Sequence, residues 1–144
     1  MNTEIHEPLF EPVLLNGRFY LEKIINTGGM SSIYQAQDIL SGSKVVIKLC
    51  FNEEKITDFR QEIRILRSCA HPAIQKVLAS GAYHDCTYYV MPFHEGNNLR
   101  EYIDTFFSIT EKEVLELFLQ ITDAVAYLNK HKILHNDLKP QNIL

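Results

Sequence analysis

The hydrophobic pattern of the chain changes from strand-like to helix-like near Gly96. Before this point, aromatic and β-branched residues gather in short stretches separated by small and turn-forming residues, which is typical of strands joined by tight turns. Tight turns between consecutive strands indicate an antiparallel sheet, and a turn around Gly81 separates the last two strands. The strands are expected at residues 19–25, 32–37, 44–49, 74–79 and 87–91.

One helix is predicted inside this strand-rich part. Ile56, Phe59, Ile63 and Leu66 recur at steps of three and four, which puts them on one helical face. The helix should end before Pro72, because proline disfavours helical backbone in the residue that precedes it. The first part of the chain is therefore predicted to be a five-stranded antiparallel sheet with one inserted helix.

A long amphipathic helix is predicted after Gly96. Thr110 and Glu113 have the spacing of a capping box, which marks the start of a helix. Apolar residues then follow at steps of four, three, four and three, as expected for one buried face. These residues are Val114, Phe118, Ile121, Val125 and Leu128. An extended loop is expected at 133–144, and it holds most of the polar residues of this part.

These patterns predict an α+β fold in three parts. Residues 1–17 contain two of the five prolines and are expected to form an irregular leader. Residues 18–94 hold the predicted sheet and its helix, and residues 95–144 hold two helices and the polar loop.

Composition excludes several classes of protein. Of the 144 residues, 46% are hydrophobic and 22% are charged, which is ordinary for a globular domain. The net charge of −4 and the absence of a basic cluster argue against a nucleic-acid partner. No stretch reaches the roughly 18 apolar residues of a membrane span. The three cysteines have no spacing typical of a zinc site or a disulfide framework, so a reduced, cytoplasmic protein is expected.

The turn between the first two strands could hold a phosphate group. Backbone N–H groups can approach a phosphate closely only where side chains are small, and Gly28, Gly29 and Ser31 are small. The full pattern of three spaced glycines is damaged, since Asn26 and Ser31 occupy the outer positions. Taken alone, the segment favours an ordinary hairpin turn.

Lys48 and Glu62 form a second candidate group. Lys48 ends the third predicted strand, where it could place a positive charge on nucleotide phosphates. Such a lysine needs a carboxylate to fix its position, and Glu62 on the following helix could supply one. Each residue alone could equally belong to a solvated face of its strand or helix. The order of glycine turn, strand lysine and helix glutamate is more informative than any one of them.

The polar loop holds the third candidate group. Phosphoryl transfer requires a carboxylate that orients the attacking hydroxyl, a cation near the moving phosphoryl group and oxygen ligands for magnesium. Asp137, Lys139 and Asn142 supply these three functions, and Pro140 stiffens the backbone between them.

Over residues 18–144, the chain resembles the N-terminal part of a eukaryotic-type protein serine/threonine kinase, and it is similar to the bacterial branch of that family. The resemblance rests on the following segments: Gly28-Gly29-Met30, Val45-Val46-Ile47-Lys48, Phe59-Arg60-Gln61-Glu62, His71-Pro72-Ala73-Ile74 and His135-Asn136-Asp137-Leu138-Lys139-Pro140-Gln141-Asn142. It implies a kinase fold, ATP and Mg²⁺ as cofactors, and a protein substrate that the sequence does not identify.

The resemblance also implies roles for individual residues. Lys48 would pair with Glu62 and with the nucleotide phosphates. Asp137 would be the catalytic base, Lys139 the phosphate-facing cation and Asn142 a metal ligand. Met91 falls at the position that gates the adenine pocket, followed by the hinge backbone of Pro92 and His94, while Ile33 and Val46 would enclose the base. The implied nucleotide-binding set is Ile25, Asn26, Thr27, Gly28, Gly29, Met30, Ser31, Ile33, Val46, Lys48, Met91, Pro92 and His94.

Two departures from the family pattern carry expectations. Asn136 replaces the arginine that pairs with a phosphorylated activation loop, so this chain should not depend on that switch. The Asp-Phe-Gly segment of the family, which carries the principal magnesium ligand, would lie beyond Leu144. A chain that ended at this point is expected to be nearly inactive.

Two alternatives follow from the same residues. The first is a catalytically dead, kinase-like module that binds a nucleotide or a partner; the apolar face of the helix at 114–128 could then associate with a partner or with a second copy. The second is a small-molecule phosphotransferase of the aminoglycoside or choline class, which typically carries histidine where Lys139 stands. Lys139 disfavours this second alternative.

Overall fold

The computed structural model describes residues 13–105 and 109–144 of the chain. The described residues form two compact units, an N-terminal unit that ends at Phe93 and a C-terminal unit that begins at His94. Residues 70–74 are the exception, because they belong to the C-terminal unit although they precede the last two strands. The first twelve residues of the predicted leader lie outside the described part.

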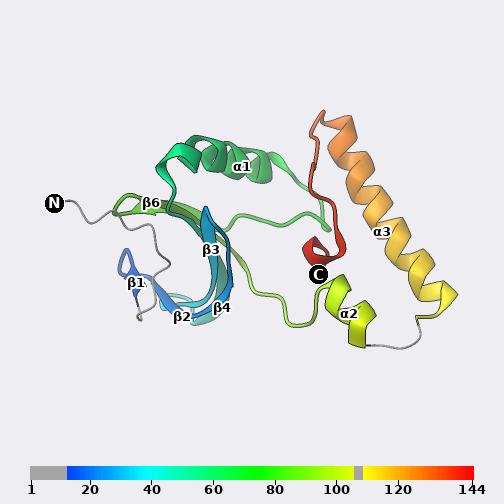
Figure 1. Cartoon of the computed structure of the whole chain (residues 1–144), viewed down its shortest axis with the longest axis horizontal. Helices are drawn as coiled ribbons and strands as arrows, with labels where there is room; N and C mark the ends of the chain where they lie inside the picture. Colours follow the sequence, from blue (N-terminus) through cyan, green and yellow to red (C-terminus); the bar gives the residue numbers. More distant parts are fainter. Residues whose placement is uncertain (1–12, 106–108) are drawn as a thin grey trace. The chain divides into compact units, whose positions relative to one another are not determined.

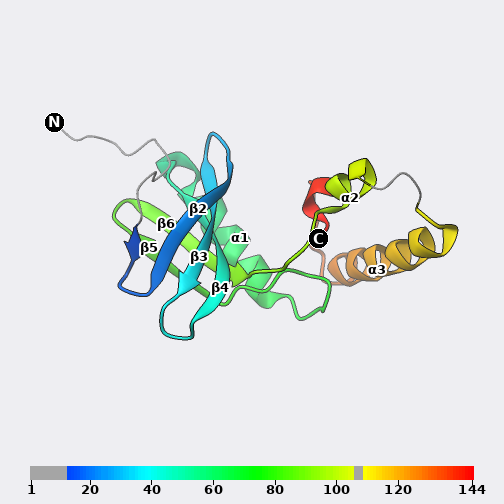
Figure 2. The same ribbon diagram turned by 90° about the horizontal axis from the view of Figure 1, so that it is seen from below.

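The N-terminal unit is a six-stranded antiparallel sheet with one α-helix (Figures 1 and 2). The strand order is β1-β2-β3-β4-β6-β5, so each strand from β1 to β4 pairs with its sequence neighbour. The elements are β1 (Leu14–Leu15), β2 (Phe19–Thr27), β3 (Ser31–Asp38), β4 (Ser43–Cys50), η1 (Glu53–Lys55), α1 (Ile56–Ser68), β5 (Ala79–Tyr83) and β6 (Cys86–Pro92). The predicted fold class, an antiparallel sheet with one inserted helix, is confirmed.

The sixth strand is a short addition to the five that the sequence predicts. β1 lies in the segment expected to be irregular, and it pairs Leu15 with Phe19 through a tight turn. Asn16 and Gly17 in this turn have φ values of 50° and 66°, the left-handed geometry that tight hairpin turns favour. The side-chain amide of Asn16 also donates to the carbonyl of Ala82 in β5, at 3.0 Å. This bond links the two edges of the sheet, which curls accordingly (Figure 2).

The strand predicted at 74–79 is wrong in position. Only Ala79 belongs to a strand, and β5 continues to Tyr83 through Gly81. A Cβ atom at Gly81 would lie 2.8 Å from the hydroxyl oxygen of Tyr88, so glycine is required there because an aromatic ring covers the strand. The turn instead falls at His84, which adopts a φ of 49°.

Strand alternation divides the core between the two faces of the sheet. One face is filled by side chains of the curled sheet itself, among them Tyr34, Ile47 and Val90, all at most 1% exposed. The other face packs against α1, which contributes Phe59 and Ile63 as buried residues (Figure 1). The helical period read from the sequence is confirmed, and α1 ends at Ser68, before the proline.

The C-terminal unit contains α2 (Leu99–Thr105), α3 (Glu111–Lys130) and η2 (Pro140–Asn142). The predicted capping box is present, since the Glu113 N–H donates to the Thr110 hydroxyl and the Thr110 N–H donates to the Glu113 carboxylate. The hydroxyl of Tyr127 accepts a hydrogen bond from the backbone N–H of Ala70, which joins residues 70–74 to α3. Of the predicted apolar face of α3, only Leu128 is buried.

No helix in residues 13–105 or 109–144 combines the length and apolar character needed to cross a membrane.

Candidate active site

One face of the sheet gathers most of the predicted nucleotide-binding residues. Ile33 in β3, Val46 in β4 and Met91 in β6 each lie next to a buried core residue in their strand. Because side chains alternate along a strand, these three lie on the face of the sheet opposite to the curled core. The register places Val46 opposite Met91 and Ile33 opposite Lys48. All four side chains are half-buried, and they share the face that carries α1.

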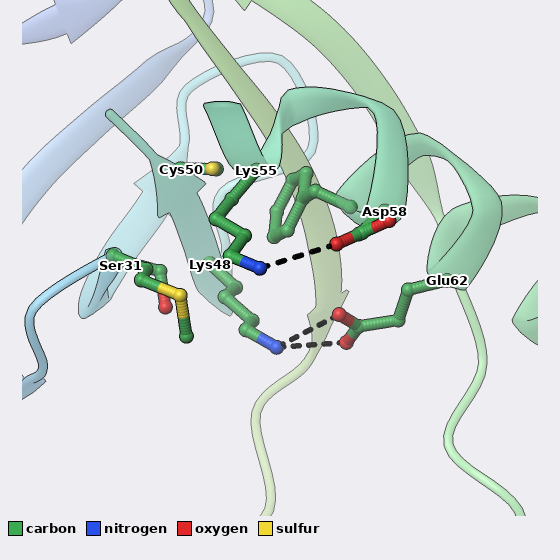
Figure 3. Close-up of a pocket in the computed structure, with 8 residues that line it drawn as sticks. Ser31, Lys48, Cys50, Lys55, Asp58 and Glu62 are labelled. Atoms are coloured by element: carbon green, nitrogen blue, oxygen red, sulfur yellow. Dashed lines mark hydrogen bonds and ion pairs between the residues drawn. The ribbon is translucent and has the colours of Figure 1, made fainter. Parts of the chain in front are cut away.

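Lys48 and Glu62 form an ion pair within this unit. The Nζ atom of Lys48 lies 2.8 and 3.1 Å from the two carboxylate oxygens of Glu62 (Figure 3). β4 fixes the lysine, and α1 brings the glutamate to it from across the sheet face. The lysine side chain is 24% exposed and the glutamate side chain 38%, so solvent and ligands can reach the pair.

A pocket of about 210 Å³ surrounds this ion pair. It is bounded by the tip of the β2–β3 turn, by the end of β4 and by the first turns of α1 (Figure 3). Its lining residues are Met30, Ser31, Lys48, Cys50, Lys55, Asp58, Phe59 and Glu62. Four of these residues are not among those predicted for the site from the sequence: Cys50, Lys55, Asp58 and Phe59. In the sequence, Phe59 belongs to the apolar period of α1 and to the segment Phe59-Arg60-Gln61-Glu62, and the apolar period predicts that it is a core residue.

The β2–β3 turn places two glycines where the fold itself does not require them. The Gly28 N–H donates to the carbonyl of Ser31, which closes the turn, and the Phe51 N–H donates to the carbonyl of Met30. A Cβ atom at Gly29 would meet nothing within 4 Å, and one at Gly28 would lie 3.7 Å from its nearest neighbour. Neither glycine has a positive φ. The small size of these two residues therefore leaves the backbone open to an external group.

The remaining predicted nucleotide-binding residues lie at the ends of the strands. Ile25, Asn26 and Thr27 end β2 and are exposed. Pro92 ends β6 opposite Val45, and its backbone offers only a carbonyl. His94 is the first residue of the C-terminal segment that follows the sheet.

Asp137, Lys139 and Asn142 are in contact with one another in the C-terminal unit. The Asp137 carboxylate accepts from Lys139 Nζ at 2.9 Å and from the side-chain amide of Asn142 at 3.0 Å. The same amide nitrogen donates to the backbone carbonyl of Asp137 at 2.8 Å. The hydrogen bond from Lys139, followed by that from Asn142, holds the pKa of Asp137 below its usual range. The loop is tied to α2 through the Leu99 N–H and the Ile143 carbonyl.

Asn136 adopts a φ of 59° immediately before Asp137. The Asp137 N–H donates to the carbonyl of His135 at 2.8 Å, so the backbone makes a tight turn at this asparagine. Asparagine tolerates left-handed backbone better than most residues, because its short polar side chain can bond locally. The asparagine that departs from the family pattern is therefore suited to the conformation that it adopts.

The charged residues predicted for the site thus fall into two groups. Lys48 and Glu62 lie beside a glycine turn on an antiparallel sheet, and Asp137, Lys139 and Asn142 lie on a loop after a long helix. This fold and these two groups define the class of protein kinases. Residues 19–144 match the protein kinase domain family, and the chain belongs to that family.

The similar proteins include several bacterial kinases. The chain is 36% identical to the serine/threonine-protein kinase PrkC of Bacillus subtilis over 135 residues, which cover 90% of this chain and 21% of PrkC. It is 32% identical to the probable serine/threonine-protein kinase YbdM of the same organism over 145 residues, which cover 95% of this chain and 56% of YbdM. The chain therefore spans about a fifth of the length of PrkC and somewhat more than half of the length of YbdM.

A solved structure shares the fold. The crystal structure of Rad53 1-466 in complex with AMP-PNP matches with a TM-score of 0.75 and 24% sequence identity. The match covers 85% of this chain and 33% of that chain.

Proposed function

We propose that this chain binds ATP and belongs to a protein serine/threonine kinase, which transfers the γ-phosphoryl group of MgATP to a protein hydroxyl. The observation that carries the proposal is the Lys48–Glu62 ion pair beside the open glycine turn. The complex of Rad53 with AMP-PNP and the names of the bacterial relatives support it. A cytoplasmic location, where ATP is available, is part of the same proposal.

The nucleotide would occupy the sheet face that carries α1. Ile33 and Val46 would enclose the adenine, and Met91 would close the inner end of its pocket. The Pro92 carbonyl and the His94 backbone would meet the adenine edge. Lys48 would then place its ammonium group on the α- and β-phosphates while Glu62 holds it in position.

The Gly28–Gly29 turn would cover the phosphates. Its backbone N–H groups would donate to phosphate oxygens that no side chain keeps at a distance. Asn26 is exposed and Ser31 half-buried, and both keep this turn polar without bulky side chains.

Asp137 would orient the attacking hydroxyl and accept its proton. The hydrogen bonds from Lys139 and Asn142 lower the pKa of Asp137, so its ionised carboxylate is suited to accept the hydrogen bond that orients the hydroxyl. Lys139 lies 2.9 Å from that carboxylate, and its charge would offset the charge that develops on the transferred phosphoryl group.

The oxygen donors of the loop fit magnesium. Magnesium prefers carboxylate and amide oxygens and is commonly held by one or two protein groups together with substrate phosphates. The side chain of Asn142 donates two hydrogen bonds to Asp137 through its nitrogen, which turns the amide oxygen toward a different partner such as a cation. The residues that the structure describes contain no cluster of three or more acidic, histidine or cysteine side chains. Bound magnesium would neutralise phosphate charge.

The experiment that tests this function is nucleotide binding by the full chain, measured by calorimetry with MgATP. Lys48→Met should weaken binding at least about tenfold, because a charge-assisted contact to phosphate is lost. Lys76→Met removes a charge of the same kind from an exposed loop of the N-terminal unit and is the matched control. Absence of binding by the wild-type chain, or an equal loss in both variants, would refute the proposed site.

A second candidate function is partner binding through α3, which one observation favours. Five apolar residues of this helix are exposed to solvent, from 39% to 62% of each residue. They are Val114, Leu115, Phe118, Leu119 and Val125. An exposed apolar face is typical of an interaction surface, and the partner proposed for it is a second copy of the chain. Sedimentation of the wild type and of Phe118→Glu would test it; a wild type that stays monomeric at high concentration excludes self-association.

A further inference from the structure

Tyr89 makes a contact with the ion pair that neither the sequence motifs nor the proposed roles include. Its hydroxyl group donates to Oε1 of Glu62 at 2.8 Å. The same oxygen accepts from Lys48 Nζ at 2.8 Å, while Oε2 accepts from Lys48 at 3.1 Å. Glu62 is therefore held by two donors on two different strands of the sheet.

The position of the Tyr89 ring is fixed by its surroundings. The residue is 3% exposed, and it lies opposite Lys48 in the register between β4 and β6. Its ring packs against Phe59 with centroids 5.3 Å apart. Burial raises the pKa of Tyr89, and the charge of Glu62 raises it further, so the hydroxyl stays protonated and remains a donor.

Glu62, in contrast, belongs to a helix with limited anchoring. α1 buries Phe59 and Ile63 and packs Ile56 and Leu66 only partly buried beside them, and its N-cap residue makes no side-chain capping bond. A glutamate on such a helix loses rotamer entropy when it is held toward Lys48, and a rigid second donor helps to offset that loss. The Tyr89 hydroxyl is placed to do so in the absence of nucleotide.

We propose that Tyr89 is a positioning residue that holds Glu62 toward Lys48, so that the ion pair is formed before nucleotide binds. Its effect on nucleotide affinity rests on the proposed function, whereas its effect on the ion pair does not. Tyr89 has no contact with the nucleotide in this proposal and acts through Glu62.

The chain offers a matched control in Tyr88. This neighbour is also 3% exposed, and its hydroxyl also makes a hydrogen bond, accepting from the Asn16 side chain at 2.9 Å. Strand alternation points it to the opposite face of the sheet, where it contacts Phe19. Tyr88→Phe and Tyr89→Phe therefore remove equivalent atoms, but only Tyr89→Phe removes a bond to the ion pair.

The first measurement is the acylation rate of Lys48 in the ligand-free full chain, followed by mass spectrometry with a trace of acetic anhydride. The carboxylate of Glu62 shields the Lys48 amine from the reagent while the pair is formed, so Tyr89→Phe should raise the rate, by up to about tenfold for the loss of a hydrogen bond to a charged group. Tyr88→Phe should leave the rate within about twofold of wild type. An unchanged rate in Tyr89→Phe, or an equal increase in both variants, would overturn the proposal.

The second measurement is MgATP affinity, which should fall in Tyr89→Phe and not in Tyr88→Phe. If the wild type binds no MgATP while the Lys48 rates still differ, the proposed function fails and the positioning role stands. If Tyr89→Phe does not fold, the reciprocal variant Glu62→Gln decides. With ¹³C at the tyrosine Cζ, that variant should shift the Tyr89 signal and leave the Tyr88 signal in place, and an unmoved Tyr89 signal counts against the proposal.

Discussion

Replacing Phe59 with alanine should separate the stability of the N-terminal unit from its ability to bind nucleotide. Phe59 is 5% exposed, packs against Tyr89 and has its ring centroid 5.5 Å from the ammonium group of Lys48. It thus anchors α1 and also supports the ion pair. Phe59→Ala should both destabilise the unit and weaken MgATP binding. The same substitution at a core residue away from the Lys48–Glu62 pair should lower stability alone.

The magnitude follows from the burial of the ring. Truncation of a buried phenylalanine to alanine costs about 3–5 kcal/mol in general. Phe59 lines the pocket of about 210 Å³, so water can enter the space that the ring leaves, and the lower end of the range applies. The aromatic pair with Tyr89 and the contact with Lys48 add about 0.5–1 kcal/mol each at most. The expected loss in free energy of unfolding is therefore about 3–5 kcal/mol.

The control is Phe19→Ala on the opposite face of the sheet. Phe19 is 4% exposed and its ring lies 6.2 Å from that of Tyr88, so it should lose similar stability. Urea denaturation gives the free energy of unfolding, and calorimetry with MgATP on the folded fraction gives the affinity. A loss below about 1 kcal/mol for Phe59→Ala, or an equal loss of affinity in both variants, would refute the reasoning.

Three further predictions concern other parts of the chain. In a chain extended past Leu144 to include the Asp-Phe-Gly segment, Asp137→Asn should lower phosphoryl transfer about 100-fold or more while MgATP affinity stays unchanged, as measured by transfer of labelled phosphate to a basic protein; full activity would contradict the role of this carboxylate. Gly81→Ala should lower stability by about 1–3 kcal/mol in urea, because the added methyl group overlaps the ring of Tyr88; wild-type stability would show that the ring can move. Asp38 accepts two hydrogen bonds from Arg18, and its pKa is lowered to about 2. Its contribution should be complete above its unfolded pKa of about 4 and lost as pH falls to about 2. The difference in melting temperature between wild type and Asp38→Asn should shrink over that interval, and a constant difference would contradict the assignment.

The regular elements were predictable from sequence where a single periodic signal dominated. β4 alternates strictly, with Val45, Ile47 and Leu49 buried on one face, and the same alternation places Lys48 on the other. The capping box at Thr110 is a local interaction, so its presence depended on nothing else in the fold.

The strand β5 could not be predicted in the same way. Its residues Ala79–Tyr83 include a serine and a glycine, and the apolar run just before it has the more strand-like composition. Val77 in that run packs against the α1 side of the sheet from a loop. What makes Gly81 a strand residue is the ring of Tyr88 lying over it, and this contact leaves no local signal in the sequence.

The candidate site likewise contains residues that could be predicted from the sequence and residues that could not. The order of the motifs was sufficient to single out Lys48 and Glu62, since a strand lysine near phosphates needs a carboxylate to fix its position and Glu62 follows on the next helix. The sequence marks Tyr89 and Phe59 only as strand and helix residues, because aromatic residues at such positions are usually core. Their relation to the ion pair emerges only when the β4–β6 register and the docking of α1 are known.

The two polar groups also differ in how they are stabilised. Asp137 contacts Lys139 and Asn142, residues two and five positions away, so a short loop holds its own geometry once Asn136 adopts its turn. The Lys48–Glu62 pair joins residues 14 positions apart and depends on α1 remaining docked. Loss of packing under α1 should therefore disrupt the ion pair while leaving the Asp137 loop intact. A shift of α1 would accordingly change the ion pair and, through it, the proposed nucleotide affinity. The hydrogen bond from the Tyr89 hydroxyl to Glu62 connects β6 to α1 and therefore opposes such a shift.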